Sequence, residues 1–269
     1  MKIEKFVTAT TDNNLYYQFC GFASQNMKNK FGQNCEIVIA YITDRDESDE
    51  RYKRICEFAT VVKIDPIPEL EIGIQAKVSR LWLASQSDSP CAIIDVDWFA
   101  LNEDFFLNCF DNCKEGTLGV IGSNAFSGTR DEGKFPMNMV HGHNETFRKI
   151  INPKNLQYRD LLLSWDCNRF DGKENVFNRF NGFSDESLLR KLVHDCGMEN
   201  QITHNHMPSH RPYGFSSRID RSNWNFDLEK MRSGYYIDSQ PLRPINDNLG
   251  AISPLLEYLN LEVDKFYIK

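Results

Sequence analysis

Two aspartates one residue apart, Asp95 and Asp97, directly follow an apolar run at residues 91–94. If that run is a buried strand whose geometry continues to Asp97, both carboxylates point to the same side, because side chains alternate along a strand. Carboxylate oxygens are the ligands that hard divalent cations such as Mg²⁺ and Mn²⁺ prefer. The pair therefore indicates a metal site, although a capping Asp95 and a solvated Asp97 would give the same pattern.

The segments before this pair alternate between strands and helices. Short apolar runs predict strands at residues 5–10, 36–43, 60–64, 91–96 and 117–121. Apolar residues at helical spacing, such as Ile74, Val78 and Leu81, predict helices between them. This order is typical of βαβ units, so we expect an α/β fold with a mostly parallel sheet covered on both faces. Open sheets of this kind bind ligands at the carboxyl ends of their strands, where the aspartates are expected.

The second half of the sequence lacks this regular alternation of strands and helices. From Gly122 onward, glycines and prolines interrupt a polar stretch, which predicts loops. Helices are predicted at residues 145–151, 159–165, 185–196 and 253–261. Because no repeat or low-complexity linker is present, we expect a single domain over residues 1–269 whose last segment, 216–269, wraps around the rest.

The composition is that of a globular protein, with 41% hydrophobic and 26% charged residues among 269. A formal net charge of −7 argues against nucleic acid as a partner, because binding phosphates requires clustered Lys and Arg. Eight cysteines without a C-x-x-C pair favour free thiols in a reducing compartment. No apolar run reaches the roughly 18 residues of a membrane span, and no signal peptide is visible, so a cytoplasmic protein is expected.

Three short segments together resemble the GT-A-fold glycosyltransferases, in particular the glycogenin-like and lipopolysaccharide-glucosyltransferase branches. They are FVTATTDNNLY at residues 6–16, KVSRLW at residues 77–82 and the D-x-D of Asp95 and Asp97. The resemblance covers roughly residues 5–212, and D-x-D is its one diagnostic motif. It implies a GT-A-like mixed, mostly parallel sheet flanked by helices, with a nucleotide-binding half at residues 1–121 and an acceptor and catalytic half at 122–215.

The same resemblance implies an activity. A metal-dependent enzyme of this class moves a sugar, here a hexose, from a UDP-sugar donor to a glycan or glycoprotein acceptor. Mn²⁺ or Mg²⁺ bridges the two donor phosphates. A more distant resemblance, to chlorovirus enzymes that glycosylate capsid protein, implies a viral capsid protein as the acceptor.

The resemblance also implies a donor site assembled from several segments. Its residues are Thr8, Thr10, Asp12, Arg80, Asp95, Val96 and Arg211. Thr8, Thr10 and Asp12 would contact the nucleoside, although a plain turn explains the same residues. Arg80 would assist the diphosphate or the aspartates, unless it forms an ion pair on a helix surface.

Two further groups of residues complete the implied site. A histidine late in the chain would join Asp95 and Asp97 as a metal ligand. His204 and His206 are the candidates, with His210 not excluded by the spacing. Asp185 and Glu186, at the start of a predicted helix, would be catalytic. One would act as general base in an inverting enzyme, or would support the donor in a retaining one. As plain helix-start residues they would instead complement the helix dipole.

Two other functions fit parts of the pattern. One is a non-catalytic module that binds a nucleotide or a carbohydrate. The other is a phosphohydrolase that uses D-x-D as nucleophile and acid. That class usually has its motif near the N-terminus with Thr or Val two residues beyond it, whereas Phe99 stands at that position here.

Overall fold

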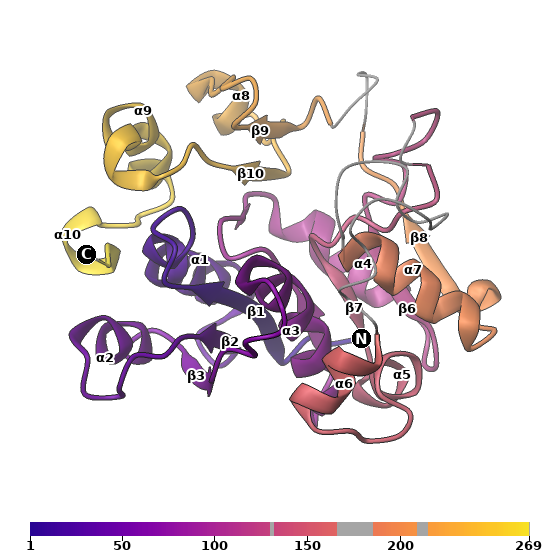
Figure 1. Cartoon of the computed structure of the whole chain (residues 1–269). Helices are drawn as coiled ribbons and strands as arrows, with labels where there is room; N and C mark the ends of the chain where they lie inside the picture. The colour runs from indigo at the N-terminus through magenta and orange to yellow at the C-terminus, as the bar shows by residue number, and fades with distance from the viewer. Residues whose placement is uncertain (130–131, 166–184, 209–214, 269) are drawn as a thin grey trace.

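The centre of the protein is a seven-stranded sheet. The computed structural model describes residues 1–129, 132–165, 185–208 and 215–268 (Figure 1). In spatial order the strands are β3 (Thr60–Ile64), β2 (Glu36–Ile42), β1 (Lys5–Thr11), β4 (Cys91–Ile93), β7 (Val140–Gly142), β6 (Leu118–Ile121) and β8 (Ile202–Asn205). Neighbours pair in parallel except that β7 runs antiparallel to both β4 and β6. The predicted mixed, mostly parallel α/β sheet is confirmed.

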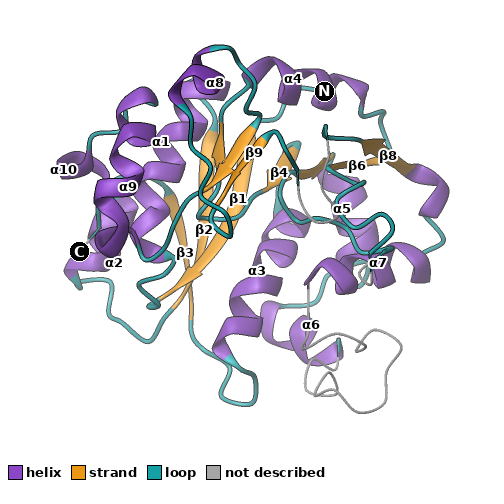
Figure 2. Cartoon of the chain, turned by 90° about the horizontal axis from the view of Figure 1, so that it is seen from above, coloured by secondary structure: helices purple, strands orange, loops and turns teal. Residues whose placement is uncertain are grey.

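Both faces of this sheet are buried by helices, as Figure 2 shows from above. The helices are α1 (Cys20–Phe31), α2 (Glu50–Cys56), α3 (Ile72–Gln86), α4 (Glu103–Asn112), α5 (Asn144–Ile151), α6 (Tyr158–Ser164), α7 (Asp185–Asp195), α8 (Leu228–Arg232), α9 (Ile245–Tyr258) and α10 (Val263–Phe266). In β1, Val7 packs toward α3, α5, α6 and α7, whereas Phe6 packs toward α1, α2 and α4. Burial on both faces explains why β2 and β4 are apolar at nearly every position.

The C-terminal segment forms a second, three-stranded sheet with a piece of chain that follows Asp97. In this sheet β10 (Asp238–Gln240) pairs antiparallel with β5 (Phe99–Ala100) and parallel with β9 (Arg218–Asp220). Helices α9 and α10 then pack on α1 through a separate apolar cluster that includes Phe22, Leu255 and Phe266. The last segment is thereby anchored next to the D-x-D turn.

Helix α9 differs from the helix predicted at 253–261. It begins at Ile245 and ends at Tyr258, with Pro254 inside it. Proline is more common in the first turn of a helix than in its interior, so Pro254 occupies an unusual position. Ile252 and Leu255, on either side of the proline, are both fully buried, and this packing continues the helix through it.

None of the helices in the described ranges combines the length and the apolar character that a bilayer crossing needs. The cysteines in those ranges are free thiols, as predicted.

The contact between α1 and α10 gives a prediction about stability. A Cβ on Gly21 would lie 2.3 Å from the backbone oxygen of Phe266. Gly21→Ala is therefore expected to lower the free energy of unfolding by ~1–3 kcal/mol through overpacking, measured by urea denaturation. Gly250→Ala is the matched control, because that helical glycine is exposed with nothing within 4 Å. The control is expected to gain about 0.5–1 kcal/mol, and equal effects of the two variants would contradict the packing argument.

His141, on β7, is fully buried and gives a prediction about pH. Its ring packs against Phe110 and close to Gly119. Burial lowers the pKa of His141 to about 4 from its ordinary 6.5. The folded state thus binds fewer protons than the unfolded chain, and stability falls as the pH drops from 6.5 toward 4, by about 3 kcal/mol in full. Urea curves at pH 7 and 4.5 should show a smaller loss for His141→Gln than for the parent. Equal losses would contradict this assignment.

Candidate functional site

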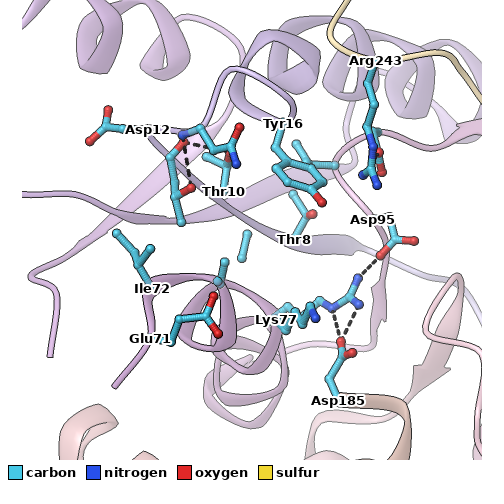
Figure 3. Close-up of a pocket in the computed structure, with 18 of the residues that line it drawn as sticks. Thr8, Thr10, Asp12, Tyr16, Glu71, Ile72, Lys77, Asp95, Asp185 and Arg243 are labelled. Carbon is cyan, nitrogen blue, oxygen red and sulfur yellow. Dashed lines mark hydrogen bonds and ion pairs between the residues drawn. The ribbon is translucent and has the colours of Figure 1, made fainter. Parts of the chain in front are cut away.

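A cavity of about 500 Å³ opens at the carboxyl ends of β1 and β4, against one face of α3 (Figure 3). Residues from the N-terminal half, α7 and the C-terminal segment line it together. They are Thr8, Ala9, Thr10, Thr11, Asp12, Asn13, Tyr16, Glu71, Ile72, Gly73, Ala76, Lys77, Arg80, Asp95, Val96, Asp97, Asp185, Arg221 and Arg243. The position matches the place where open α/β sheets bind ligands.

The D-x-D pair lies in a turn and not on the strand. Strand β4 ends at Ile93, so the expectation that strand geometry continues to Asp97 is wrong. In the turn the two side chains are free to take different directions. Asp95 faces α3, where Arg80 contacts it, and Asp97 faces the C-terminal segment. Both nevertheless line the same cavity.

Arg80 bridges two carboxylates inside the cavity, Asp95 and Asp185. Figure 3 labels these two carboxylates. Its Nε donates to Asp185 Oδ2 at 2.9 Å, its Nη2 pairs with the same oxygen, and its Nη1 pairs with Asp95 Oδ1. Nη1 also donates to the backbone oxygen of Ile94 at 3.2 Å. Arg80 and Asp185 are 8% and 4% exposed, so this bridge is a buried one and not an ion pair on a helix surface.

The charge on Asp95 is held by that bridge. Burial by itself raises the pKa of Asp95, but the charge of the Arg80 guanidinium and its hydrogen bond outweigh burial, and the pKa lies below its usual range. Asp95 Oδ2 faces Gln240, whose Nε2 is 3.4 Å away on β10. The side chain is 25% exposed, so the ionised carboxylate is accessible from the cavity.

Asp97 is held from the other side by two arginines that sequence reasoning missed. Its Oδ2 pairs with Arg221 Nη1 and accepts a hydrogen bond from Arg243 Nη1 at 2.9 Å. Arg221 follows β9 and Arg243 follows β10. No motif marks either arginine in the sequence, because their approach to Asp97 depends on the pairing of β10 with β5.

Next to this pair, a buried clasp fixes the turn after β4. Trp98 Nε1 donates to Asp238 Oδ2 at 2.8 Å, and Arg218 Nε donates to Asp238 Oδ1 at 2.9 Å. Trp98 and Asp238 are 0% and 1% exposed. Because Trp98 directly follows Asp97, the clasp ties the D-x-D turn to β10.

Thr8 and Thr10 line the cavity from β1, each only 1% exposed. The hydroxyl of Thr10 donates to the backbone oxygen of Thr11 at 3.3 Å. The hydroxyl of Thr8, in contrast, has no hydrogen-bond partner among the described residues. A buried hydroxyl without a partner costs free energy, so a ligand that supplied one would be favoured there.

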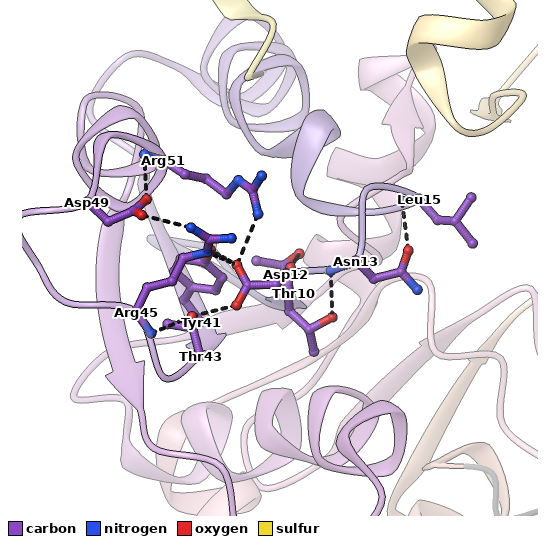
Figure 4. Close-up of polar contacts among 10 residues, drawn as sticks. Thr10, Asp12, Asn13, Leu15, Tyr41, Thr43, Arg45, Asp49 and Arg51 are labelled. Carbon is purple, nitrogen blue, oxygen red and sulfur yellow. Dashed lines mark hydrogen bonds and ion pairs between the residues drawn. The ribbon is translucent and has the colours of Figure 1, made fainter.

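Asp12 is the centre of a polar network at the rim of the cavity (Figure 4). Its carboxylate accepts hydrogen bonds from Tyr41 at 2.6 Å, Thr43 at 2.7 Å and Arg51 at 3.1 Å, and pairs with Arg45. Burial alone raises the pKa of Asp12, and the bonds from Tyr41, Thr43 and Arg45 outweigh it, so the net shift is downward. Hydrogen bonds to both carboxylate oxygens of Asp12 thus fix the loop that follows β1.

The remaining candidates are separated by the fold. Val96 and Asp185 line the cavity, whereas Glu186 is not among its lining residues. His204 and His206 are exposed, on β8 and just after it, and β8 is three strands away from β4, roughly 14 Å at the usual strand spacing. Arg211 and His210 lie outside the described residues.

The donor atoms around the D-x-D turn fit a hard cation. Within the described ranges, no cluster of three or more His, Cys, Asp or Glu side chains could hold a metal. Asp95 and Asp97 supply two carboxylates to the cavity, and each uses one oxygen for its arginine partners. Mg²⁺ is commonly bound by one or two carboxylates together with substrate phosphates and water, which is the set that this pair can complete.

No family model matches the chain, and no curated protein matches it. Among solved structures it is similar to the glycosyltransferase GlyE of Streptococcus pneumoniae TIGR4 (10% identity, TM-score 0.45, 76% of this chain and 45% of that chain). It is also similar to a glycosyltransferase involved in glycosylation of the major capsid of PBCV-1 (7%, 0.44, 96% and 98%). A third is mannosyltransferase PcManGT of Pyrobaculum calidifontis, solved with GDP-Man and Mn²⁺ (11%, 0.42, 76% and 54%).

Nucleotidyltransferases are also among the similar structures. The chain spans less than half the length of GlyE. The similar structures thus include glycosyltransferases, the class that the sequence resembles.

Proposed function

We propose that the protein is a glycosyltransferase that uses a nucleotide-diphosphate sugar, a UDP-hexose, and a divalent cation, Mn²⁺ or Mg²⁺. The acceptor is a hydroxyl of a glycan or glycoprotein, and a capsid protein is the candidate that the distant resemblance implies. One observation carries the proposal. A single cavity at the carboxyl ends of β1 and β4 contains the D-x-D carboxylates, the Arg80–Asp185 bridge and the Thr8 hydroxyl, to which none of the described residues hydrogen-bonds.

The charges around the cavity support a role for the cation. Four cationic and five anionic side chains line it, so the protein alone offers no excess of positive charge to a diphosphate. Asp95 and Asp97 would hold the cation. When bound, it supplies Lewis-acid stabilisation of the negative charge that develops on the leaving diphosphate.

The cavity has two chemically different ends that suit the two parts of such a donor. Thr8, Thr10 and the start of α3 at Ile72 offer hydroxyl and apolar surfaces suited to a nucleoside. Asp95, Asp97 and the arginines around them suit the diphosphate, with Lys77 and Arg80 on the facing side of α3. The sugar would then lie toward Asp185.

Asp185 is the carboxylate with the position for a catalytic role. Arg80 holds its Oδ2, and the described residues make no hydrogen bond to Oδ1. In an inverting reaction Oδ1 would accept the proton of the acceptor hydroxyl. The hydroxyl oxygen would attack the anomeric carbon as the bond from that carbon to the diphosphate breaks and the nucleoside diphosphate leaves. In a retaining reaction it would accept a hydrogen bond from the donor sugar and support the cationic transition state.

Thr8→Val tests the nucleoside end of the cavity. Removing a hydroxyl that no residue in the described ranges hydrogen-bonds should leave the free energy of unfolding unchanged or raise it. The same change should weaken UDP binding about tenfold, because the ligand loses one hydrogen bond worth roughly 1.4 kcal/mol. Ser24→Ala removes a comparable buried hydroxyl on α1, away from the cavity, and should leave UDP affinity unchanged. Unaltered UDP affinity in Thr8→Val would remove Thr8 from the donor site.

The activity itself is tested with a panel of nucleotide-sugars and Mn²⁺, with release of the free nucleoside diphosphate as the readout. At least one UDP-hexose should be hydrolysed slowly without an acceptor. A non-catalytic module would bind nucleotide without turnover, and a phosphohydrolase would release phosphate from simple phosphomonoesters. Either outcome, with no nucleotide-sugar turned over, would refute the glycosyltransferase proposal.

A further inference from the structure

Asp97 is a buried carboxylate whose counter-ions come from the C-terminal segment. Its side chain is 3% exposed, and Arg221 and Arg243 both reach the same oxygen, Oδ2. The two arginines are 22% and 29% exposed and line the cavity beside Asp97. Each guanidinium is therefore accessible both to the carboxylate and to whatever occupies the cavity.

The surrounding packing places both arginines next to Asp97. Arg243 lies over the ring of Tyr16, with its Cζ 4.7 Å from the ring centroid, and Tyr16 lines the cavity as well. Arg221 follows β9, whose neighbour β10 carries the Asp238 clasp to Trp98. The backbone that bears both arginines is thus fixed relative to Asp97, and only their side chains need to turn.

We propose that Arg221 and Arg243 are exchangeable counter-ions of Asp97. In the free protein they neutralise its carboxylate. When a diphosphate donor enters, they pass to its phosphate oxygens, and Asp97 becomes available to the divalent cation that accompanies the donor. The inference rests on the proposed use of a diphosphate donor, and it makes the C-terminal segment part of the donor site.

The chemistry of the groups favours this exchange. A guanidinium forms paired hydrogen bonds to phosphate as readily as to carboxylate. An unpaired buried carboxylate costs several kcal/mol, so Asp97 needs the arginines until a cation replaces them. Conversely, a cation that approaches Asp97 without a donor meets two positive charges already on Oδ2. The free protein should therefore bind Mn²⁺ weakly and the diphosphate should bring its cation with it.

Exchange predicts opposite effects on two ligands, which a purely structural role does not. In EDTA no cation replaces the arginines, so one guanidinium passes to pyrophosphate while the other stays on Asp97. Arg221→Gln and Arg243→Gln each leave a single arginine, and each should weaken binding of inorganic pyrophosphate in EDTA about tenfold, measured by calorimetry. Each should also strengthen binding of Mn²⁺ to the phosphate-free protein about tenfold, measured by the EPR signal of free Mn²⁺. Adding Asp97→Asn to each glutamine variant identifies the site, because the Mn²⁺ bound at Asp97 is the part of the binding that this second substitution removes.

Controls keep the test independent of folding and of the enzymatic activity. Arg159→Gln removes an exposed arginine that pairs with Glu69 and should leave both titrations unchanged. Arg221→Lys retains the charge without the planar fork and should lie between the parent and Arg221→Gln in both titrations, in a chain that urea curves show to be folded. Unchanged or weaker Mn²⁺ binding in both glutamine variants, or unchanged pyrophosphate binding, would overturn the exchange. Because neither probe is a sugar donor, failure to hydrolyse nucleotide-sugars would refute the proposed function and leave this result readable.

Discussion

Replacing Asp97 by asparagine is expected to weaken UDP binding about 100-fold in the presence of Mn²⁺. Asparagine keeps the shape of the side chain and still accepts a hydrogen bond from Arg243, but it loses the charge that would hold the cation. Losing one charged ligand of a metal that bridges two phosphates is worth roughly 3 kcal/mol, or about two powers of ten in affinity. Calorimetry with UDP in Mn²⁺ measures the change.

Two comparisons make the Asp97→Asn result specific. Uridine, which lacks phosphates, should bind parent and variant equally, because the nucleoside end of the cavity is untouched. Asp111→Asn, at an exposed carboxylate that pairs with the N-terminus, should leave UDP affinity unchanged. If Asp97→Asn bound UDP in Mn²⁺ as tightly as the parent, Asp97 would have no part in the cation site.

Replacing Arg80 by glutamine is expected to lower the free energy of unfolding by ~3–5 kcal/mol at neutral pH and to abolish transfer. Arg80 lies between Asp95 and Asp185, and Asp185 is buried. Without the guanidinium, the buried carboxylate of Asp185 loses its counter-charge and lies close to a second carboxylate, that of Asp95. Removing one partner of a buried ion pair destabilises other proteins by about 3–5 kcal/mol. Urea denaturation measures the loss.

The pH dependence of the Arg80→Gln defect follows from Asp95. In the parent the guanidinium keeps the pKa of Asp95 in the folded state below its ordinary 3.8. The ion pair therefore contributes its full stability above pH 3.8, and this stability is lost as the pH falls through the pKa of Asp95 in the folded state. The difference between parent and variant should therefore narrow below about pH 4. Arg159→Gln, in an exposed ion pair, should change stability by less than about 1 kcal/mol. A loss as small as this in Arg80→Gln would contradict the bridge.

The first half of the fold could be predicted because β1 and β2 are largely buried on both faces and the edge strand β3 is a short apolar run. The prediction for β3 matches the structure, and those for β1 and β2 differ from it by one residue at the carboxyl end. Strands β7 and β8 are three and four residues long and contain His141, Thr203 and His204, so no apolar run marked them. The pairs that β5 and β10 form join segments far apart in the sequence, which a local pattern does not contain.

The candidate site divides in the same way. Asp95 and Arg80 could be singled out because each belongs to a segment that resembles a known class, and Asp185 because it begins a predicted helix; the structure brings them into contact. Arg221 and Arg243 belong to no motif, and their contact with Asp97 exists only through the pairing of the C-terminal strands. A strand that continued to Asp97 would also point both carboxylates to one side, so no contact of Asp97 with the C-terminal segment was expected.

The most direct test of the account is a crystal structure of the protein with UDP and Mn²⁺. One nucleotide should lie in the cavity, with Mn²⁺ held by Asp95 and Asp97 next to its phosphates. The nucleoside should lie against Thr8, and Arg221 and Arg243 should contact phosphate oxygens. UDP ordered at another place on the protein, or a cavity without nucleotide at a saturating UDP concentration, would contradict it.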